Sequence, residues 1–154
     1  MSRVIVLDTG PLGLLPSPKR SAATASCAAW AVGILRAGHR FVVPAIADFE
    51  LRRELERAGK TQSLVLLNAW NAASPGRYLS VTDSALRLAA KLWAQARNAR
   101  LGTADPKELD ADVLIAAQAL DLGISPPGMV VATTNVGRLS RYVPAELWMD
   151  VLPS

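Results

Sequence analysis

Short apolar runs alternate with helical segments over the whole chain, and this alternation is the feature that most limits the fold. The clearest runs cover residues 4–7, 41–43 and 129–132, and further strands are expected over residues 78–81 and 148–152. Continuous apolar runs of this length are typical of strands buried on both faces in parallel sheets. Because parallel strands need helical crossovers, the sequence predicts a three-layer α/β/α fold around a central, mostly parallel sheet.

Capping residues indicate where several of the helices begin. The helices are expected over residues 22–37, 45–58, 62–72, 83–101 and 106–122. Ser21 and Thr82 directly precede two of them and are suitable N-caps. The clearest start has Asp105 as N-cap, Pro106 at the first helical position and Glu108 at the third.

Length and composition limit the class of protein. A chain of 154 residues with about half of them apolar suits one domain over residues 1–154. The single cysteine, Cys27, cannot form an internal disulfide, which suits a reducing compartment. No apolar run is long enough for a signal peptide or a membrane span, so a cytoplasmic protein without membrane contact is expected. Seventeen basic against thirteen acidic residues fit a polyanionic partner but also many ordinary proteins.

Polar residues follow two of the expected strands. Asp8 comes directly after residues 4–7, and Asn135 follows the strand over residues 129–132. In parallel α/β sheets the ligand crevice lies outside the carboxyl ends of the strands, so either side chain is a candidate ligand there. The alternatives are ordinary ones. Asp8 can cap the segment after Gly10, and Asn135 can be a turn former.

Glu50 lies on the same face of an expected helix as Ile46 and Glu54. Arg53 and Arg57 each stand three residues after one of the two acids. The pattern alone therefore favours two solvent-exposed ion pairs over a binding site.

Asp110 and Asp112 lie early in the helix expected over residues 106–122, on opposite flanks of its apolar stripe. Periodicity therefore cannot choose between them, and both can simply complement the helix dipole. Residues 113–120 are apolar nearly all round, which predicts a well-buried helix. A carboxylate at its rim then needs a partner, and a metal ion would supply one.

Four segments of the chain, taken in order, resemble the motifs of PIN domains. They are VIVLDTGP at 4–11, PAIADFELRREL at 44–55, DADVLIAA at 110–117 and VATTNVGRL at 131–139. Their order and spacing cover nearly the whole chain, whose length is that of a stand-alone VapC-like toxin. The resemblance implies a PIN-like fold and a metal-dependent endoribonuclease, the toxin of a toxin–antitoxin pair.

Carried over from the family pattern, the catalytic and metal-binding acids are Asp8, Glu50 and Asp112, with Asp110 as an auxiliary candidate. Asn135 is a second auxiliary residue, since many members have an aspartate there. Three carboxylates held close together need a neutralising cation, and their oxygen ligands favour Mg²⁺ or Mn²⁺ over zinc.

The resemblance also implies an RNA substrate, a cognate antitoxin and a homodimer. The arginines nearest the motifs are candidates for holding the RNA backbone. They are Arg52, Arg53, Arg138 and Arg141. Two other functions are compatible with the same motifs. One is a PIN nuclease in RNA maturation or decay without an antitoxin, and the other is a catalytically idle PIN-like module that binds RNA or a protein, with Asn135 as the sign of lost activity.

Overall fold

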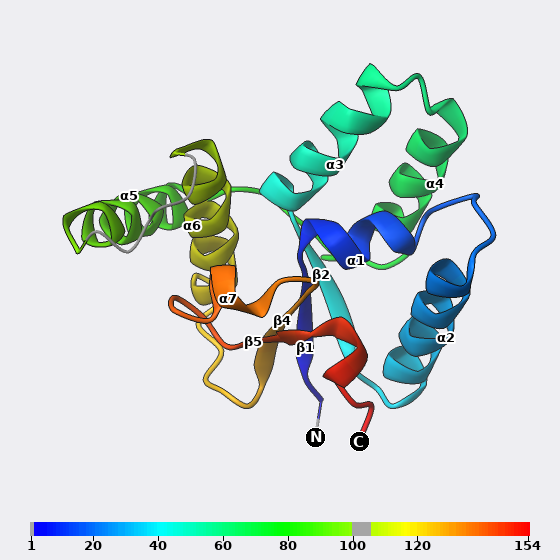
Figure 1. Ribbon diagram of the computed structural model, residues 1–154. Coiled ribbons are helices and arrows are strands. Elements are labelled where there is room, and N and C mark those ends of the chain that lie inside the picture. The colour runs from blue at the N-terminus through cyan, green and yellow to red at the C-terminus, as the bar shows by residue number, and fades with distance from the viewer. Residues whose placement is uncertain (1, 100–105) are drawn as a thin grey trace.

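Five parallel strands form the centre of the computed structural model, which describes residues 2–99 and 106–154 (Figure 1). Within these residues the strand order is β3-β2-β1-β4-β5, and each neighbouring pair is parallel. The strands are β1 (Val4–Leu7), β2 (Arg40–Pro44), β3 (Tyr78–Leu79), β4 (Met129–Thr133) and β5 (Ala145–Leu147). The predicted fold class is therefore confirmed, with a sheet that is parallel throughout.

The helices follow the predicted positions closely. They are α1 (Thr9–Leu14), α2 (Ala22–Arg36), α3 (Ala45–Arg57), α4 (Thr61–Ala72), α5 (Asp83–Asn98), α6 (Pro106–Leu120), α7 (Val136–Leu139) and a 3-10 turn (Trp148–Asp150). Ser21 caps α2 by accepting from the Thr24 amide, and Thr82 caps α5 by accepting from the Ala85 amide. The predicted cap Asp105 lies outside the described residues.

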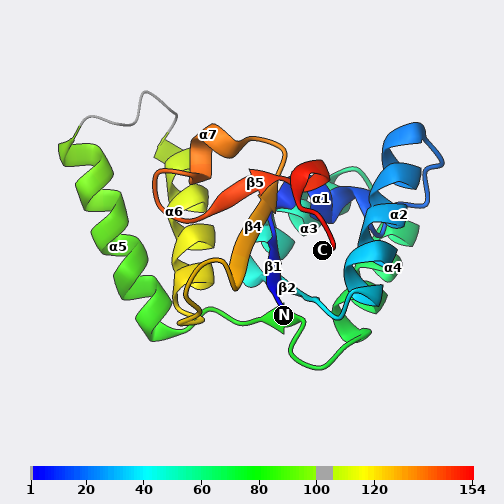
Figure 2. The same cartoon turned by 90° about the horizontal axis from the view of Figure 1, so that it is seen from below.

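Alternate residues of β1 pack into two separate cores, as a strand covered on both faces requires. Ile5 and Leu7 join the core formed with α1, α2 and α4. Val4 and Val6 join the core formed with α6 and α7. Figure 2 shows α2 and α4 on one side of the sheet and α5 and α6 on the other.

The prediction of a strand over residues 148–152 was wrong. The last strand ends at Leu147, and the chain then turns in a 3-10 helix. The Trp148 ring packs edge-on against Trp30 of α2, with 5.5 Å between the ring centroids, and the Trp30 indole donates to the Val151 carbonyl over 2.8 Å. These apolar residues therefore cover α2 instead of extending the sheet.

The other differences concern the ends of elements and short elements. The strand expected over residues 78–81 ends at Leu79, and β5 was not predicted. The C-terminus of α5 is Asn98, not residue 101, with Ala99 as the C-cap, and α6 ends at Leu120 before a turn to Gly123. The short helices α1 and α7 were not predicted, because six and four residues carry too little periodicity.

The strand order places a topological switch point between β1 and β4. From β1 the chain runs to β2 and β3 on one side, then returns to β4 on the other side of β1. Ligand sites of such sheets lie at this point, outside the carboxyl ends of the two strands. The approach of α1 to the residue after β4 is close here, since a Cβ on Gly10 would lie 2.6 Å from the Thr134 side chain. None of the described helices is long and apolar enough to span a membrane.

Candidate active site

Asp8 leaves the end of β1 at the switch point, and both of its carboxylate oxygens accept hydrogen bonds. Oδ1 accepts from the Thr9 amide over 2.8 Å, and Oδ2 accepts from the Thr133 hydroxyl over 2.6 Å. Asp8 is therefore the N-cap of α1, as one of the two interpretations expected. The same bonds hold its carboxylate against the end of β4, so a role as a cation ligand stays a prediction.

Glu50 reaches the same region from α3. Its Oε1 accepts from the Thr9 hydroxyl over 2.9 Å, and its Oε2 lies 3.9 Å from the Arg53 guanidinium. Its side chain is 20% exposed, whereas that of Glu54, paired with Arg57, is 57% exposed. The two glutamates of the predicted helix face therefore differ, because only Glu50 is held at the switch point.

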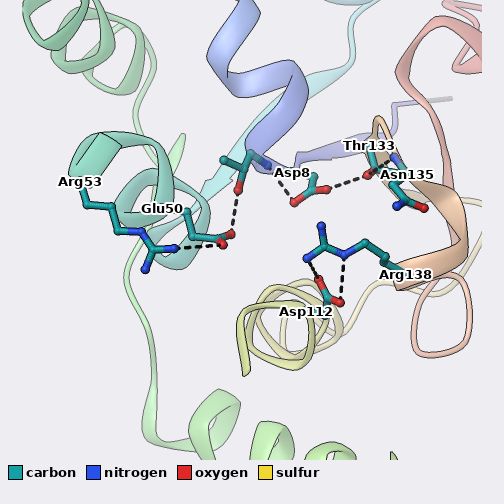
Figure 3. Close-up of polar contacts among 8 residues, drawn as sticks. Asp8, Glu50, Arg53, Asp112, Thr133, Asn135 and Arg138 are labelled. Atoms are coloured by element: carbon teal, nitrogen blue, oxygen red, sulfur yellow. Dashed lines mark hydrogen bonds and ion pairs between the residues drawn. The ribbon is translucent and has the colours of Figure 1, made fainter. Parts of the chain in front are cut away.

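Asp112 comes from α6, and both of its oxygens accept from Arg138. The distances are 2.8 Å from Nη2 to Oδ1 and 3.2 Å from Nε to Oδ2. Burial raises the pKa of Asp112 to about 6, against the lowering effect of Arg138, and the negative charges of Asp8 and Glu50 add to the rise. The three predicted acids are thus close enough for their charges to act on one another (Figure 3).

Asp110 lies on the other flank of α6 and is exposed. It lines a pocket of about 220 Å³ between α3 and α6, together with Glu50 and Arg53. Asp110 therefore shares this pocket with Glu50, whereas Asp112 is buried against Arg138. The principal role of Asp112 and the auxiliary role of Asp110 stay predictions.

Asn135 stands at the start of α7, with its backbone amide donating to the Thr133 hydroxyl over 3.0 Å. The residue is exposed, and its side chain makes no capping hydrogen bond to α7. Its contribution to a metal site stays a prediction.

The four candidate arginines have different surroundings. Arg52 makes two hydrogen bonds to the buried carboxylate of Asp48, which also accepts from Asn71 of α4. Asp48 therefore ties α3 to α4, and Arg52 is bound to Asp48 and not to a site acid. Arg141 lies near the Tyr142 ring. Arg53 and Arg138 are the two candidates paired with a site acid.

Three polar residues that organise the site were missed by the sequence analysis. Thr9 and Thr133 orient the carboxylates of Asp8 and Glu50, and their positions directly after β1 and at the end of β4 were the available signal. Gln118 is 1% exposed and holds the start of α3 through the Ile46 amide, over 3.2 Å. It is the one polar residue of the apolar segment 113–120, which was its signal.

The donor set fits a hard divalent cation, since three carboxylates contribute only oxygen ligands. Among the described residues, however, no three acidic, histidine or cysteine side chains lie close enough together to bind one metal ion as they stand. In Figure 3 the Arg138 guanidinium lies between the Asp112 and Asp8 carboxylates. Metal binding at these acids therefore requires side chains to move.

Comparison with known proteins gives matches among solved structures. No protein-family model and no curated protein matches the sequence. A chain of VapBC2 from Rickettsia felis, bound to a DNA fragment from its promoter, superposes with a TM-score of 0.67 at 14% identity, covering 94% of this chain and 98% of that one. FitAcB from Neisseria gonorrhoeae gives 0.66 at 22% identity, with 96% and 99% covered. FitAB bound to an IR36 DNA fragment gives 0.66 at 23% identity, with 96% of both chains covered. At these identities the likeness shows the fold, and it confirms the predicted PIN-like architecture.

Proposed function

We propose that this chain is a metal-dependent endoribonuclease and the toxin of a toxin–antitoxin pair. The observation that carries the proposal is the meeting of Asp8, Glu50 and Asp112, from β1, α3 and α6, at the switch point of the sheet. The likeness in fold to VapBC2 and FitAB, which are toxin–antitoxin complexes, supports the toxin role.

Asp8, Glu50 and Asp112 are the residues that would hold Mg²⁺ or Mn²⁺. The bound cation would activate a water for attack on a phosphodiester and stabilise the leaving 3′-oxygen. Thr9 and Thr133 fix two of the carboxylates, so that their oxygens are oriented before substrate arrives. Hydrolysis of this kind leaves 5′-phosphate and 3′-hydroxyl ends.

Arg53 is suited to bind the RNA backbone at the rim of the cleft. Its side chain is 56% exposed and its ion pair with Glu50 is long, at 3.9 Å, so its donors are accessible to a phosphate. The guanidinium also lies over the exposed Phe49 ring, 5.4 Å from the centroid. This combination of charge and aromatic surface fits a single-stranded substrate.

An antitoxin would cover the same cleft. We expect a segment that folds on binding, with a basic side chain directed at the carboxylates. Phe49 is 57% exposed beside the Asp110 pocket and offers that segment an apolar contact. Homodimer formation belongs to the same proposal and is tested by mass measurement in solution.

The two aspartates of α6 provide a matched test of the site. Asp112→Asn should lower metal-dependent RNA cleavage by at least roughly 100-fold. Loss of a metal ligand should cost no less than loss of a residue that only hydrogen-bonds to a ligand. Asp110→Asn removes the same charge two residues away and should keep cleavage within about threefold of wild type. Initial rates on one labelled RNA, with and without Mg²⁺, give both values.

The opposite pattern, with Asp110→Asn inactive and Asp112→Asn active, would show that the two roles were exchanged. An idle binding module would cleave no RNA as wild type and would show no thermal shift with Mg²⁺ or Mn²⁺.

A further inference from the structure

Arg138 approaches the site acids from α7, on the far side of the cleft from Glu50 (Figure 3). Its guanidinium donates to both oxygens of Asp112, over 2.8 and 3.2 Å. The Asp112 side chain is 11% exposed and that of Arg138 is 42% exposed. A planar fork that satisfies both oxygens of a carboxylate is a strong form of side-chain ion pair, and here the carboxylate is largely shielded from water while the guanidinium is partly exposed.

The atoms bound by Arg138 are the atoms that a cation needs. A divalent ion at Asp112 has to take at least one of these oxygens, and it brings a like charge toward the guanidinium. Figure 3 places the guanidinium between Asp112 and Asp8, in the space toward which the acids converge. Arg138 and the metal therefore cannot hold Asp112 in this arrangement together.

The other site acids are bound in a way that leaves them open to a metal. Asp8 accepts from a backbone amide and a hydroxyl, which are neutral donors. Glu50 accepts from a hydroxyl, and its arginine partner is 3.9 Å away and half exposed. A carboxylate oxygen can accept more than one bond, so these contacts orient the ligands without opposing a cation.

We propose that Arg138 is a built-in competitor of the divalent cation, so that metal binds at Asp112 only when the guanidinium has left that carboxylate. The inference rests on the proposed function, because it requires the three acids to bind metal. It adds a regulatory property, since the chain's own arginine then sets the metal concentration at which the site fills.

The test is the Mn²⁺ affinity of the full chain, measured by calorimetry without RNA. Arg138→Gln removes the competing charge and should bind Mn²⁺ about tenfold or more tightly than wild type. Arg57→Gln removes an arginine that is paired with the exposed Glu54, outside the site, and should bind as wild type does. Measurement at pH 8 keeps Asp112 ionised, and melting curves in EDTA verify that each variant is folded.

Arg138→Lys separates local competition from net charge. Lysine keeps the charge but cannot bond both Asp112 oxygens with one planar group, so its Mn²⁺ affinity should also exceed that of wild type. If the lysine variant equals wild type while the glutamine variant binds more tightly, net charge alone explains the effect and the proposed competition is overturned.

The remaining outcomes separate this inference from the proposed function. An unchanged or weaker affinity in Arg138→Gln, with clear binding by wild type, overturns the competition alone and makes Arg138 a residue that positions Asp112. If neither wild type nor any arginine variant binds Mn²⁺, the metal-dependent function fails together with the inference.

Discussion

The surroundings of a carboxylate, more than its place in a motif, decide what it can do in this chain. Asp110 and Asp112 are two residues apart on α6, yet Asp110 is exposed at the cleft rim and Asp112 is buried against Arg138. Burial raises the pKa of Asp112 to about 6, because water no longer stabilises its ionised form. A site acid of this kind reduces the stability of the fold while it remains ionised without a metal.

This raised pKa predicts a pH-dependent stability. The folded-state pKa of Asp112 lies above its unfolded value of about 4, so its cost is absent at low pH, grows as pH rises through this interval and is complete above about 6. Between pH 5 and 7.5 the free energy of unfolding in EDTA should fall by roughly 1 kcal/mol more in wild type than in Asp112→Asn.

Urea unfolding of both proteins at the two pH values measures the difference. The change in the free energy of unfolding between the two pH values is compared between the two proteins. This difference removes the contributions of the other titrating groups and the cost of leaving Arg138 unpaired in Asp112→Asn. An equal pH dependence in both would show that Asp112 titrates as an ordinary exposed carboxylate.

At the scale of elements, the site depends on a buried amide that joins three of them. Gln118 of α6 accepts from the Ile46 amide over 3.2 Å and donates to the Leu79 carbonyl over 2.9 Å. It thereby connects α6 with the start of α3, which carries Glu50, and with β3. Because the side chain is 1% exposed, water cannot replace either bond.

Gln118→Leu should therefore be strongly destabilising despite its similar volume. Two backbone groups lose their partners, each at about 1–3 kcal/mol, so unfolding should require about 2–6 kcal/mol less free energy. Gln62→Leu, on an exposed position of α4, should change stability by less than about 0.5 kcal/mol. Chemical denaturation measures both, and similar values for the two variants would contradict this role.

An element could be predicted where its conformation depends on neighbouring residues, and not where it depends on residues far away in the sequence. Ser21 and Thr82 act through their own neighbours in sequence, so the starts of α2 and α5 were predicted. The prediction for residues 148–150 was wrong, because their conformation depends on Trp30, more than a hundred residues away. The Arg138 pair with Asp112 has the same origin, since 26 residues separate its partners and no local pattern links them.

At the scale of the whole molecule, the order of the strands in the sheet brings the site acids together. Positions 8, 50 and 112 are distant in sequence and come together because β1 lies between β2 and β4, with the helices after β2 and before β4 beside it. That ligands gather at the carboxyl ends of such strands was predictable, and the positions of Asp8 and Asn135 were read in this way. The choice between Asp110 and Asp112 required family resemblance, because periodicity left both open.

The proposed toxin role predicts an effect on the whole cell. Expression of this chain alone should arrest growth, and co-expression of an adjacent small gene should relieve the arrest, because the proposed antitoxin would cover the site acids. Asp112→Asn should be harmless at the same protein level. Harmless expression of folded wild type would favour a nuclease without antitoxin or an idle module.

The most direct test of the central claim is cleavage of a defined RNA panel with and without Mg²⁺, by wild type and by Asp8→Asn. We expect Mg²⁺-dependent cleavage with 5′-phosphate and 3′-hydroxyl ends, and a loss of at least roughly 100-fold in the variant. The Asp8→Asn side chain can still cap α1 through its amide oxygen, so the fold should remain intact. Equal cleavage by the two proteins, or full activity in EDTA, would show that Asp8 binds no catalytic metal ion.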